Sequence, residues 1–314
     1  MLRELRGGLT ALALVVTGVL LAVSVDLGIP GQALLQSLRF HIGAALLGLV
    51  VLLFVGGAWR RAWVFVLVLA ISAGQGVAII YHQQEPRLAL AALPGKPLMT
   101  LLSFNLLASN QNGESIARFI AGSGADVAVL MEAAPIASHR AILSAVYPYQ
   151  AGCDDGSRCG GVVILSRTPL ADITVQSMSG AWLNRLVTAN TTIGGQKINL
   201  VAAHLVKPYF DDFAAEEFAR LGATIDRLEG PLVLAGDFNA AAWSASIDGL
   251  LRRRSLVPGP LYPATWPVRL GPLGVPIDNI FTRAPLVIEN ISAMADSMGS
   301  NHRGLMAEIG VTGQ

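Results

Sequence analysis

Three stretches near the N-terminus contain no charged side chain: Leu9–Val25, Ile42–Trp59 and Ala62–Tyr81. An α-helix rises about 1.5 Å per residue, so about 20 apolar residues cross the roughly 30 Å hydrocarbon core of a bilayer. All three stretches are close to that length. They predict a membrane region of three transmembrane helices over residues 1–81, with the lipid bilayer as a partner.

A signal peptide or a set of soluble core helices would account for these stretches less well. A cleaved signal peptide would explain the first stretch, because Arg3 and Arg6 precede it. It leaves the second and third stretches unexplained. Core helices of a soluble protein would carry a polar face, and these stretches have almost none. We therefore expect a multi-pass membrane protein.

The arginines beside the stretches predict an orientation. Arg3 and Arg6 precede the first stretch, and Arg60 and Arg61 separate the second from the third. Positively charged flanks stay in the cytoplasm. The N-terminus is therefore expected to be cytoplasmic, and three crossings place the rest of the chain outside the inner (cell) membrane of a bacterium.

Composition agrees with this division. Hydrophobic residues make up 53 % of the chain and charged residues 14 %, which is too apolar for an ordinary soluble protein. A net charge of +1 gives no support for a dedicated nucleic-acid binder, which would show a strongly basic face. The two cysteines, Cys153 and Cys159, suit a small disulfide-closed loop in an oxidising compartment, or else remain free thiols.

Residues 82–97 contain Pro86, Pro94, Gly95 and Pro97, and this composition predicts a linker. From residue 98 to residue 314, short apolar runs alternate with amphipathic stretches. Helices are predicted at Glu114–Ala121, Ile136–Ala145 and Asp211–Leu228. Strands are predicted at Leu98–Asn105, Asp126–Met131, Gly161–Leu165, Ile173–Ser177, Leu186–Thr192, Ile198–Ala203, Pro231–Ala235, Ile277–Thr282, Leu286–Ile291 and Gly304–Val311. This order favours an α/β domain of two packed mixed sheets flanked by helices.

Polar side chains close or directly follow several of the predicted strands. Any one of them could be a turn residue, but together they are of the types that bind metal or phosphate, and rigid strand ends can hold such groups around one pocket. They are Asn105, Glu132, His204, Asp237, Asn239 and Asp278.

These residues belong to ordered segments that resemble the endonuclease/exonuclease/phosphatase superfamily, which includes DNase I, apurinic endonucleases, neutral sphingomyelinases and inositol polyphosphate 5-phosphatases. The resemblance extends over about residues 98–311, and Gly236-Asp237-Phe-Asn239 is its most specific part. The other segments are Ser103-Phe-Asn105, Leu130-Met-Glu132, Gly161-Val-Val-Ile-Leu-Ser166, Ala203-His204-Leu205, Ile277-Asp278-Asn-Ile-Phe281 and Ser300-Asn301-His302.

The resemblance implies a DNase I-like four-layer sandwich and a Mg²⁺-dependent phosphoesterase, with Mn²⁺ as an alternative cofactor. It implies that Glu132 is the main metal ligand and that Asn105 contacts metal or phosphate. Asp237 would orient or deprotonate the attacking water, and Asn239 would hydrogen-bond the phosphate.

The resemblance also implies roles for the histidines. His204 and His302 would donate hydrogen bonds to the phosphate, with Asp278 holding one imidazole, that of His302 by our interpretation. Two positions depart from the family. Asn301 stands before the last histidine in place of the usual aspartate, which keeps an oxygen ligand for the metal but removes its charge. His204 stands where apurinic endonucleases carry a tyrosine, which favours the DNase I and sphingomyelinase side of the superfamily.

The predicted function is hydrolysis of a phosphate ester, a phosphodiester in preference to a monoester, in nucleic acid or phospholipid. The alternative is a catalytically silent domain that binds a phosphate-bearing ligand or a protein. We expect no obligate protein partner. Trp243 and Trp266 either line a substrate groove or are buried or half-buried aromatics. Glu216 and Glu217 are expected on an exposed helix face without a role.

Overall fold

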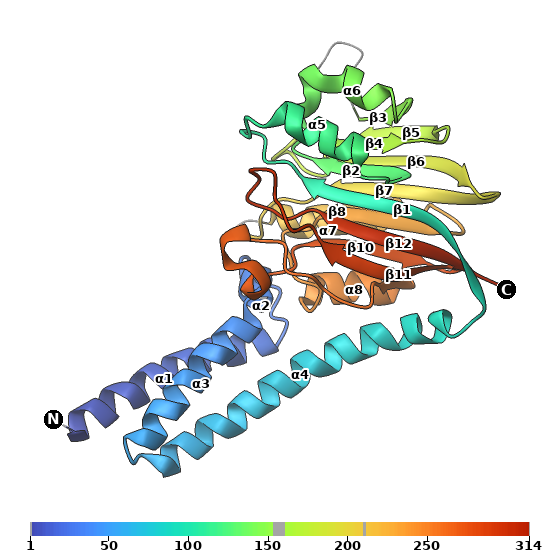
Figure 1. Cartoon of the computed structure of the whole chain (residues 1–314). Coiled ribbons are helices and arrows are strands. Elements are labelled where there is room, and N and C mark those ends of the chain that lie inside the picture. The colour runs from blue at the N-terminus through green and yellow to red at the C-terminus, as the bar shows by residue number, and fades with distance from the viewer. Residues whose placement is uncertain (1, 153–160, 210–211, 314) are drawn as a thin grey trace.

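Two six-stranded sheets form the larger part of the molecule (Figure 1). The computed structural model describes residues 2–152, 161–209 and 212–313. The first sheet has the strand order β11 (Leu286–Ala293), β12 (Leu305–Thr312), β1 (Gly95–Asn105), β2 (Val127–Met131), β4 (Val162–Ser166) and β3 (Tyr149–Ala151). The second has the order β5 (Ala171–Gln176), β6 (Leu186–Ile193), β7 (Gln196–His204), β8 (Leu232–Asp237), β10 (Asp278–Arg283) and β9 (Leu256–Pro258).

The central strands are apolar on both faces, which is why they read as continuous hydrophobic runs. In β1, Leu101 belongs to the core between the two sheets, whereas Leu102 and Phe104 belong to the core under the helices of the first sheet. In β8, Val233 faces the core between the sheets and Leu234 faces the helices of the second sheet. Successive side chains of a strand point to opposite faces, so each sheet is packed on both sides.

Helices cover the outer face of each sheet. The first sheet is covered by α5 (Gly113–Gly122), the 3₁₀-helix η1 (Ala134–His139) and α6 (Arg140–Ser144). The second is covered by α7 (Phe213–Ile225) and α8 (Ala245–Arg253). The order helix, sheet, sheet, helix confirms the predicted α/β fold of two packed mixed sheets flanked by helices.

The direction of the strands brings polar residues of the predicted site to the same end of the second sheet. In the first sheet β1 and β2 are parallel, and in the second β7 and β8 are parallel, while the other pairings are antiparallel. His204 at the end of β7 is the register partner of Asp237 at the end of β8, and Asp237 is in turn the partner of Asp278 at the start of β10. Three of the predicted site residues therefore lie on neighbouring strands.

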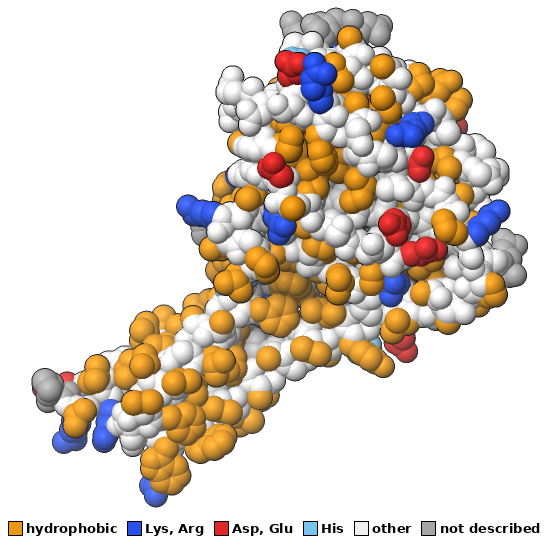
Figure 2. Space-filling model, viewed as in Figure 1, with side chains coloured by type: hydrophobic (Ala, Val, Ile, Leu, Met, Phe, Trp, Pro, Cys, Tyr) orange, Lys and Arg blue, Asp and Glu red, His pale blue; other side chains and the backbone are white. Residues whose placement is uncertain are grey.

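The N-terminal region consists of α1 (Leu2–Ser24), α2 (Gln32–Ser37), α3 (Arg39–Val55) and α4 (Trp59–Ala91). By length and composition α1 and α4 could cross a membrane, and α3 is a shorter apolar helix. Large hydrophobic side chains such as Val15, Val55 and Leu67 are exposed on this bundle. Figure 2 shows hydrophobic atoms over most of the protruding bundle, with basic side chains at its far end.

The predicted linker differs from the structure. Residues 82–91, Pro86 included, continue α4, and β1 already begins at Gly95. The helix continues because its polar side chains dock on the two-sheet domain: Gln83 Nε2 donates to the Ala242 carbonyl at 2.9 Å, and Gln84 Nε2 donates to the Gly259 carbonyl at 2.8 Å. The division into three segments by residue number remains a prediction.

Helix α2 also docks on the two-sheet domain. The Oγ of Ser37 accepts a hydrogen bond from the Ala241 amide at 2.9 Å, and the Oε1 of Gln36 accepts one from the Ala245 amide at 3.0 Å. The indole of Trp243 donates to the Gln36 carbonyl at 3.1 Å. Trp243 therefore has a structural role, which was one of the two alternatives left open by the sequence. The N-terminal region and the sheets share one packed interface.

Several short elements have no counterpart among the predicted ones. These are the strands β3 and β9, the helices α2 and α8, and the 3₁₀-helix η2 (Val268–Leu273). Helix α3, which corresponds to the predicted second apolar stretch, ends at Val55 and not at Trp59. It ends there because Gly57 adopts a left-handed backbone conformation (φ 75°). The predicted Cys153–Cys159 disulfide lies outside the described residues.

Candidate active site

The ends of β1 and β2 place Asn105 and Glu132 side by side. Asn105 is the last residue of β1 and is the register partner of Met131, so Glu132 directly follows the paired strands. The side-chain Nδ2 of Asn105 lies 3.4 Å from Glu132 Oε1, and the Ala108 backbone amide donates to Glu132 Oε2 at 2.8 Å. The Glu132 side chain is 26 % exposed, so its carboxylate is open to solvent on one side.

Asp237 lies at the centre of the site. Its Oδ2 accepts a hydrogen bond from Asn105 Nδ2 at 3.0 Å, and its Oδ1 accepts one from the Asn239 backbone amide at 2.9 Å. The imidazole Nε2 of His204 lies 3.6 Å from Asp237 Oδ2, and that of His302 lies 3.8 Å from the same oxygen. One carboxylate therefore connects both sheets and both histidines.

The backbone around Asp237 requires the residues of the Gly236-Asp237-Phe-Asn239 segment. Gly236 has a φ of 152°, and a Cβ there would overlap the Ala203 carbonyl oxygen on β7. Asn239 has a φ of 49° and Glu132 a φ of 52°, both in the left-handed region that non-glycine residues rarely adopt. Such strain clusters at functional sites, where the surrounding structure holds it in place.

His302 is oriented by Asp278. Its Nδ1 lies 2.9 Å from Asp278 Oδ2, and its backbone amide donates to Ser300 Oγ at 3.1 Å. The Ser300 hydroxyl donates to the Asn105 carbonyl at 2.7 Å, which ties this loop to the end of β1. The expected pairing of Asp278 with His302 is present as geometry.

The two histidines have opposite electrostatic surroundings. Burial lowers the pKa of His204 to about 4, because attraction by Asp237 does not offset the loss of solvation and the repulsion of Arg185. Burial also lowers the pKa of His302, but Asp278 and Asp237 outweigh it and raise the pKa to about 9. At neutral pH His204 is thus neutral and His302 is charged. Burial and the neighbouring Asp278 raise the pKa of Asp237.

Arg185 is a site residue that the sequence analysis missed. It precedes β6, and its Nη1 lies 3.4 Å from His204 Nε2, while its guanidinium lies 4.8 Å from the centre of the Trp182 ring. The Glu132 and Asp237 carboxylates both attract it. A lone arginine before a strand carries no sequence signal, so only its place beside His204 reveals it.

Asn239 and Asn301 differ in position. Asn239 is buried in the site, and its Nδ2 donates to the Leu205 carbonyl at 2.8 Å. Asn301 is exposed, and its backbone carbonyl accepts from Val268. Among the described residues no hydrogen bond joins the Asn301 side chain to the site, so its predicted role as a metal ligand remains a prediction.

The donor set suits a hard divalent cation. Carboxylate and amide oxygens are the ligands that Mg²⁺ prefers. One oxygen or nitrogen atom each of Asp237, Asp278 and His302 lies within 4.8 Å of the others, although a charged His302 offers a cation no lone pair. The buried Oδ1 of Asp278 has no hydrogen-bond partner among the described residues. The three carboxylates of Glu132, Asp237 and Asp278 lie around one charged histidine, His302. A cation would offset the surplus negative charge.

With this geometry in view, comparison with known families gives a clear result. The Endonuclease/Exonuclease/phosphatase family model matches residues 102–302, which is most of the chain and contains every predicted site residue. This chain belongs to that family. No curated protein matches the sequence significantly.

Solved structures share the fold. Tdp2 from D. rerio in complex with a single-strand DNA product has 18 % identity and a TM-score of 0.54, over 68 % of this chain and 99 % of that one. A mutant beta toxin from Staphylococcus aureus with bound magnesium ions has 17 % identity and a TM-score of 0.51, over 68 % and 99 %. Sphingomyelinase C from Streptomyces griseocarneus has 21 % identity and a TM-score of 0.50, over 68 % and 99 %. At these identities the likeness is one of fold.

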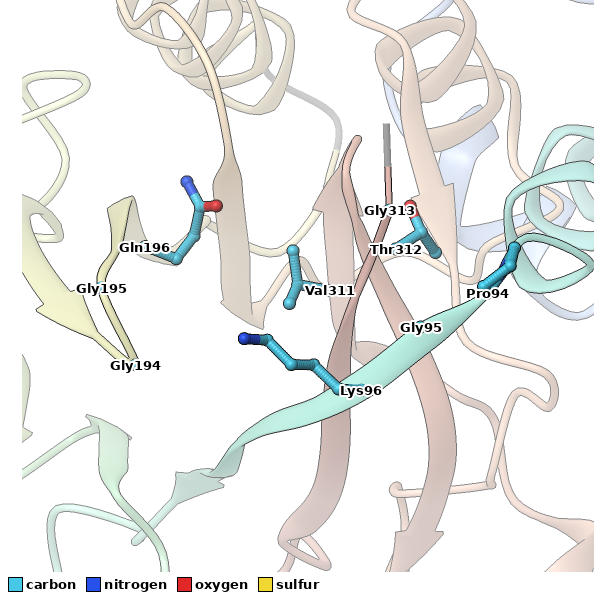
Figure 3. Close-up of a pocket in the computed structure, with 9 residues that line it drawn as sticks. All are labelled: Pro94, Gly95, Lys96, Gly194, Gly195, Gln196, Val311, Thr312 and Gly313. Carbon is cyan, nitrogen blue, oxygen red and sulfur yellow. The ribbon is translucent and has the colours of Figure 1, made fainter.

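A large cavity elsewhere does not belong to the family's site. It has a volume of about 460 Å³ and lies where β1 begins, β12 ends and the β6–β7 turn passes (Figure 3). Its polar side chains are those of Lys96, Gln196 and Thr312. This is the opposite end of the strands from Asp237, and the lining offers no carboxylate or imidazole for phosphate chemistry.

The expected exposed position is wrong for Glu217, which is fully buried. Its Oε2 accepts from the Val206 amide at 2.7 Å, and its Oε1 accepts from the Ser179 hydroxyl at 2.6 Å. The carboxylate is buried because it satisfies these two donors beneath its helix. Val206 lies two residues after His204, so Glu217 supports the segment that leaves the site.

Proposed function

We propose that this protein hydrolyses a phosphodiester with the help of a bound divalent cation, Mg²⁺ in preference to Mn²⁺. The observation that carries the proposal is the convergence of Glu132, Asp237 and His302, which come from distant parts of the sequence, on one edge of the two sheets. Family membership supports the same reaction class.

The cation would be held by Glu132 and Asn105, with Asn301 as a further ligand if its side chain turns inward. When bound, the cation would supply charge neutralisation to the non-bridging phosphate oxygens. The Glu132 carboxylate remains partly open to solvent, so a cation can reach it. Asp278 and His302 remain paired with each other.

Asp237 would orient the attacking water and accept its proton. A carboxylate whose pKa is raised is a better base near neutral pH than an ordinary one. Asn105 and the Asn239 amide fix the orientation of both carboxylate oxygens, so little rearrangement is needed when water binds. The second N–H of the Asn239 side chain would donate to the phosphate.

The two histidines would donate to the phosphate in different charge states. His302 carries a positive charge at neutral pH and would stabilise the additional negative charge of the transition state. His204 is neutral and would donate to the phosphate through Nε2 in the tautomer that carries its proton there. Asp278 would maintain the His302 tautomer.

We further propose that α1, α3 and α4 anchor the protein in a bilayer, with the catalytic domain outside the cytoplasm. The Arg6 guanidinium donates to the Gly56 carbonyl, and Arg61 donates to Thr10 at 3.1 Å, so the basic residues of the N-terminus and of the α3–α4 turn lie at one end of the bundle. That end is far from the sheets (Figure 1). The positive-inside rule would keep it in the cytoplasm.

The test is hydrolysis of bis(p-nitrophenyl) phosphate by the full chain in lipid nanodiscs, with Mg²⁺, Mn²⁺ or EDTA. We expect metal-stimulated release of p-nitrophenol and a loss of about 10²-fold or more in Asp237→Asn. Arg252→Gln on the surface of α8 serves as the control. Metal binding without turnover in any condition would instead favour the catalytically silent alternative.

A further inference from the structure

A cavity of about 250 Å³ opens directly beside the proposed catalytic residues. Asn239 and His302 line one side of it, Trp266 and Ile277 line another, and Leu34 and Leu38 line the side formed by the N-terminal region. The cavity therefore adjoins the place where the scissile phosphate would bind. The part of a substrate that fills this cavity would be the group attached to that phosphate.

The lining is apolar where it faces away from the catalytic residues. Leu34 is 38 % exposed, and Pro208, Val275 and Ile277 add further hydrocarbon. Ser37 also lines the cavity, but its hydroxyl donates to the Ala33 carbonyl at 2.8 Å and accepts from the Ala241 amide at 2.9 Å. The wall contributed by α2 therefore offers hydrocarbon to a ligand.

The position of α2 indicates the direction from which the occupant enters. This short helix connects α1 to α3, two apolar helices whose large side chains are exposed. A molecule resident in the outer leaflet would meet this connection first. The exposed cation of Lys207, also in the lining, suits a phosphate at the polar end of such a molecule.

We infer that the substrate is an amphiphilic phosphodiester, a lipid, whose hydrocarbon chain enters this cavity while its phosphate lies against Asn239 and His302, which line it. This inference rests on the proposed phosphodiesterase function and names its substrate class. Leu34 and Leu38 then determine specificity from outside the family's domain. The apolar N-terminal region thereby forms part of the substrate site as well as an anchor.

A homologous series of p-nitrophenyl alkyl phosphodiesters, from methyl to hexyl, tests the inference with the full chain in nanodiscs and Mg²⁺. These short esters are monomeric in water. Burial of each methylene should raise kcat/KM by about three- to fourfold until the chain fills the cavity. Leu34→Asn should lower the hexyl-to-methyl ratio of kcat/KM by about fivefold or more.

Leu35→Asn is the matched control, because Leu35 is on the same helix, is 40 % exposed, and is not part of the cavity lining. It should leave the ratio unchanged, and it also corrects for partition of the longer esters into the nanodisc. The p-nitrophenyl ester of thymidine 5′-monophosphate is a phosphodiester that carries a nucleoside in place of the alkyl chain.

The outcomes separate the two proposals. Hydrolysis of the methyl ester without any rise along the series would overturn the lipid inference and leave the phosphodiesterase function standing. A nucleoside ester cleaved faster than the hexyl ester would also overturn it, in favour of a nucleic-acid substrate. An equal fall of the ratio in Leu34→Asn and Leu35→Asn would show that the cavity does not bind the chain. Failure to hydrolyse any ester would sink the function itself.

Discussion

His302 and Asp278 form a buried pair at the end of the two sheets, with Nδ1 of the imidazole 2.9 Å from Oδ2 of the carboxylate. The pair joins the start of β10 to the loop before β12. Because Nδ1 is engaged with Asp278, Nε2 is the nitrogen that faces Asp237, at 3.8 Å. The carboxylate thus determines which imidazole nitrogen is available to a ligand.

Asp278→Asn should lower kcat for bis(p-nitrophenyl) phosphate by about 10²-fold, because His302 loses the charge that holds it protonated at neutral pH. The amide keeps the shape of the carboxylate, so the variant should fold, but its thermal unfolding midpoint should fall because the charge that stabilises protonated His302 is lost. Asp172→Asn on the surface is the control. A kcat equal to that of the wild type would refute the role of this pair.

Glu132→Gln should weaken binding of Mg²⁺ and Mn²⁺ by more than about tenfold, because it removes the partly exposed carboxylate from the proposed metal site. Isothermal titration calorimetry of the full chain measures this. Glu114→Gln, on the exposed face of α5, should bind metal as the wild type does. Unchanged affinity in Glu132→Gln would place the metal elsewhere.

Arg185→Ala should lower kcat/KM by about 10- to 10²-fold, because a cation beside His204 is lost from the site. Arg185→Lys should recover part of the activity, since it restores the charge without the planar fork. Steady-state kinetics measure both variants against Arg118→Ala, which breaks only an exposed pair with Glu114. If both Arg185 variants match the wild type, the guanidinium takes no part in the reaction.

Glu217→Gln should lower the free energy of unfolding by about 1–3 kcal/mol. In the wild type the Val206 amide and the Ser179 hydroxyl both donate to the carboxylate, whereas the NH₂ group of glutamine would face one of these donors. Chemical denaturation measures the change. The neighbouring Glu216→Gln should have almost no effect, since Glu216 forms an exposed pair with Arg220. Equal stability of the two variants would mean that the buried hydrogen bonds of Glu217 contribute nothing.

Alkaline pH should weaken the contact between α4 and the catalytic domain. Burial raises the pKa of Tyr262, whose hydroxyl donates to Gln83 Oε1 at 2.6 Å. The unfolded pKa is about 10. A group whose pKa is higher in the folded protein stabilises the fold fully below the unfolded pKa, and this contribution is lost as the pH rises through the folded value.

The unfolding midpoint of the wild type should therefore fall between pH 9 and pH 11. Tyr262→Phe should show a smaller fall over the same range, because it has no proton to lose there. Differential scanning calorimetry of both proteins compares the slopes, with Tyr149→Phe as the exposed control. Parallel slopes for wild type and Tyr262→Phe would exclude the Tyr262 proton as the cause.

Much of the fold could be predicted because its signals are local. Central strands such as β2 and β8 are apolar runs bounded by polar residues, and the predicted strands Asp126–Met131 and Pro231–Ala235 lie within one or two residues of them. Strands β3 and β9, of three residues each, were missed, because so short a segment forms only through its pairing with a neighbour.

The candidate site was predicted as a set of residue types but not as a geometry. The order of Asn105, Glu132 and Asp237 along the chain indicated the chemistry. Glu217 lies at helical spacing from Leu221 and Ile225 on the buried face of α7, so the helical period could have placed it inward. The approach of Arg185 to His204 depends on which loop meets the sheet, and no periodicity in the sequence reports that.

The sequence by itself determined the local features of this protein: apolar helices at the N-terminus, alternating strands and helices after them, and polar residues where strands end. These follow from side-chain period and hydrophobicity, which act over a few residues. Only the tertiary structure decided that Leu34 and His302 line one cavity and that Gln83 contacts Tyr262. Such contacts join residues far apart in the chain, and they form only when whole faces of the two regions pack together.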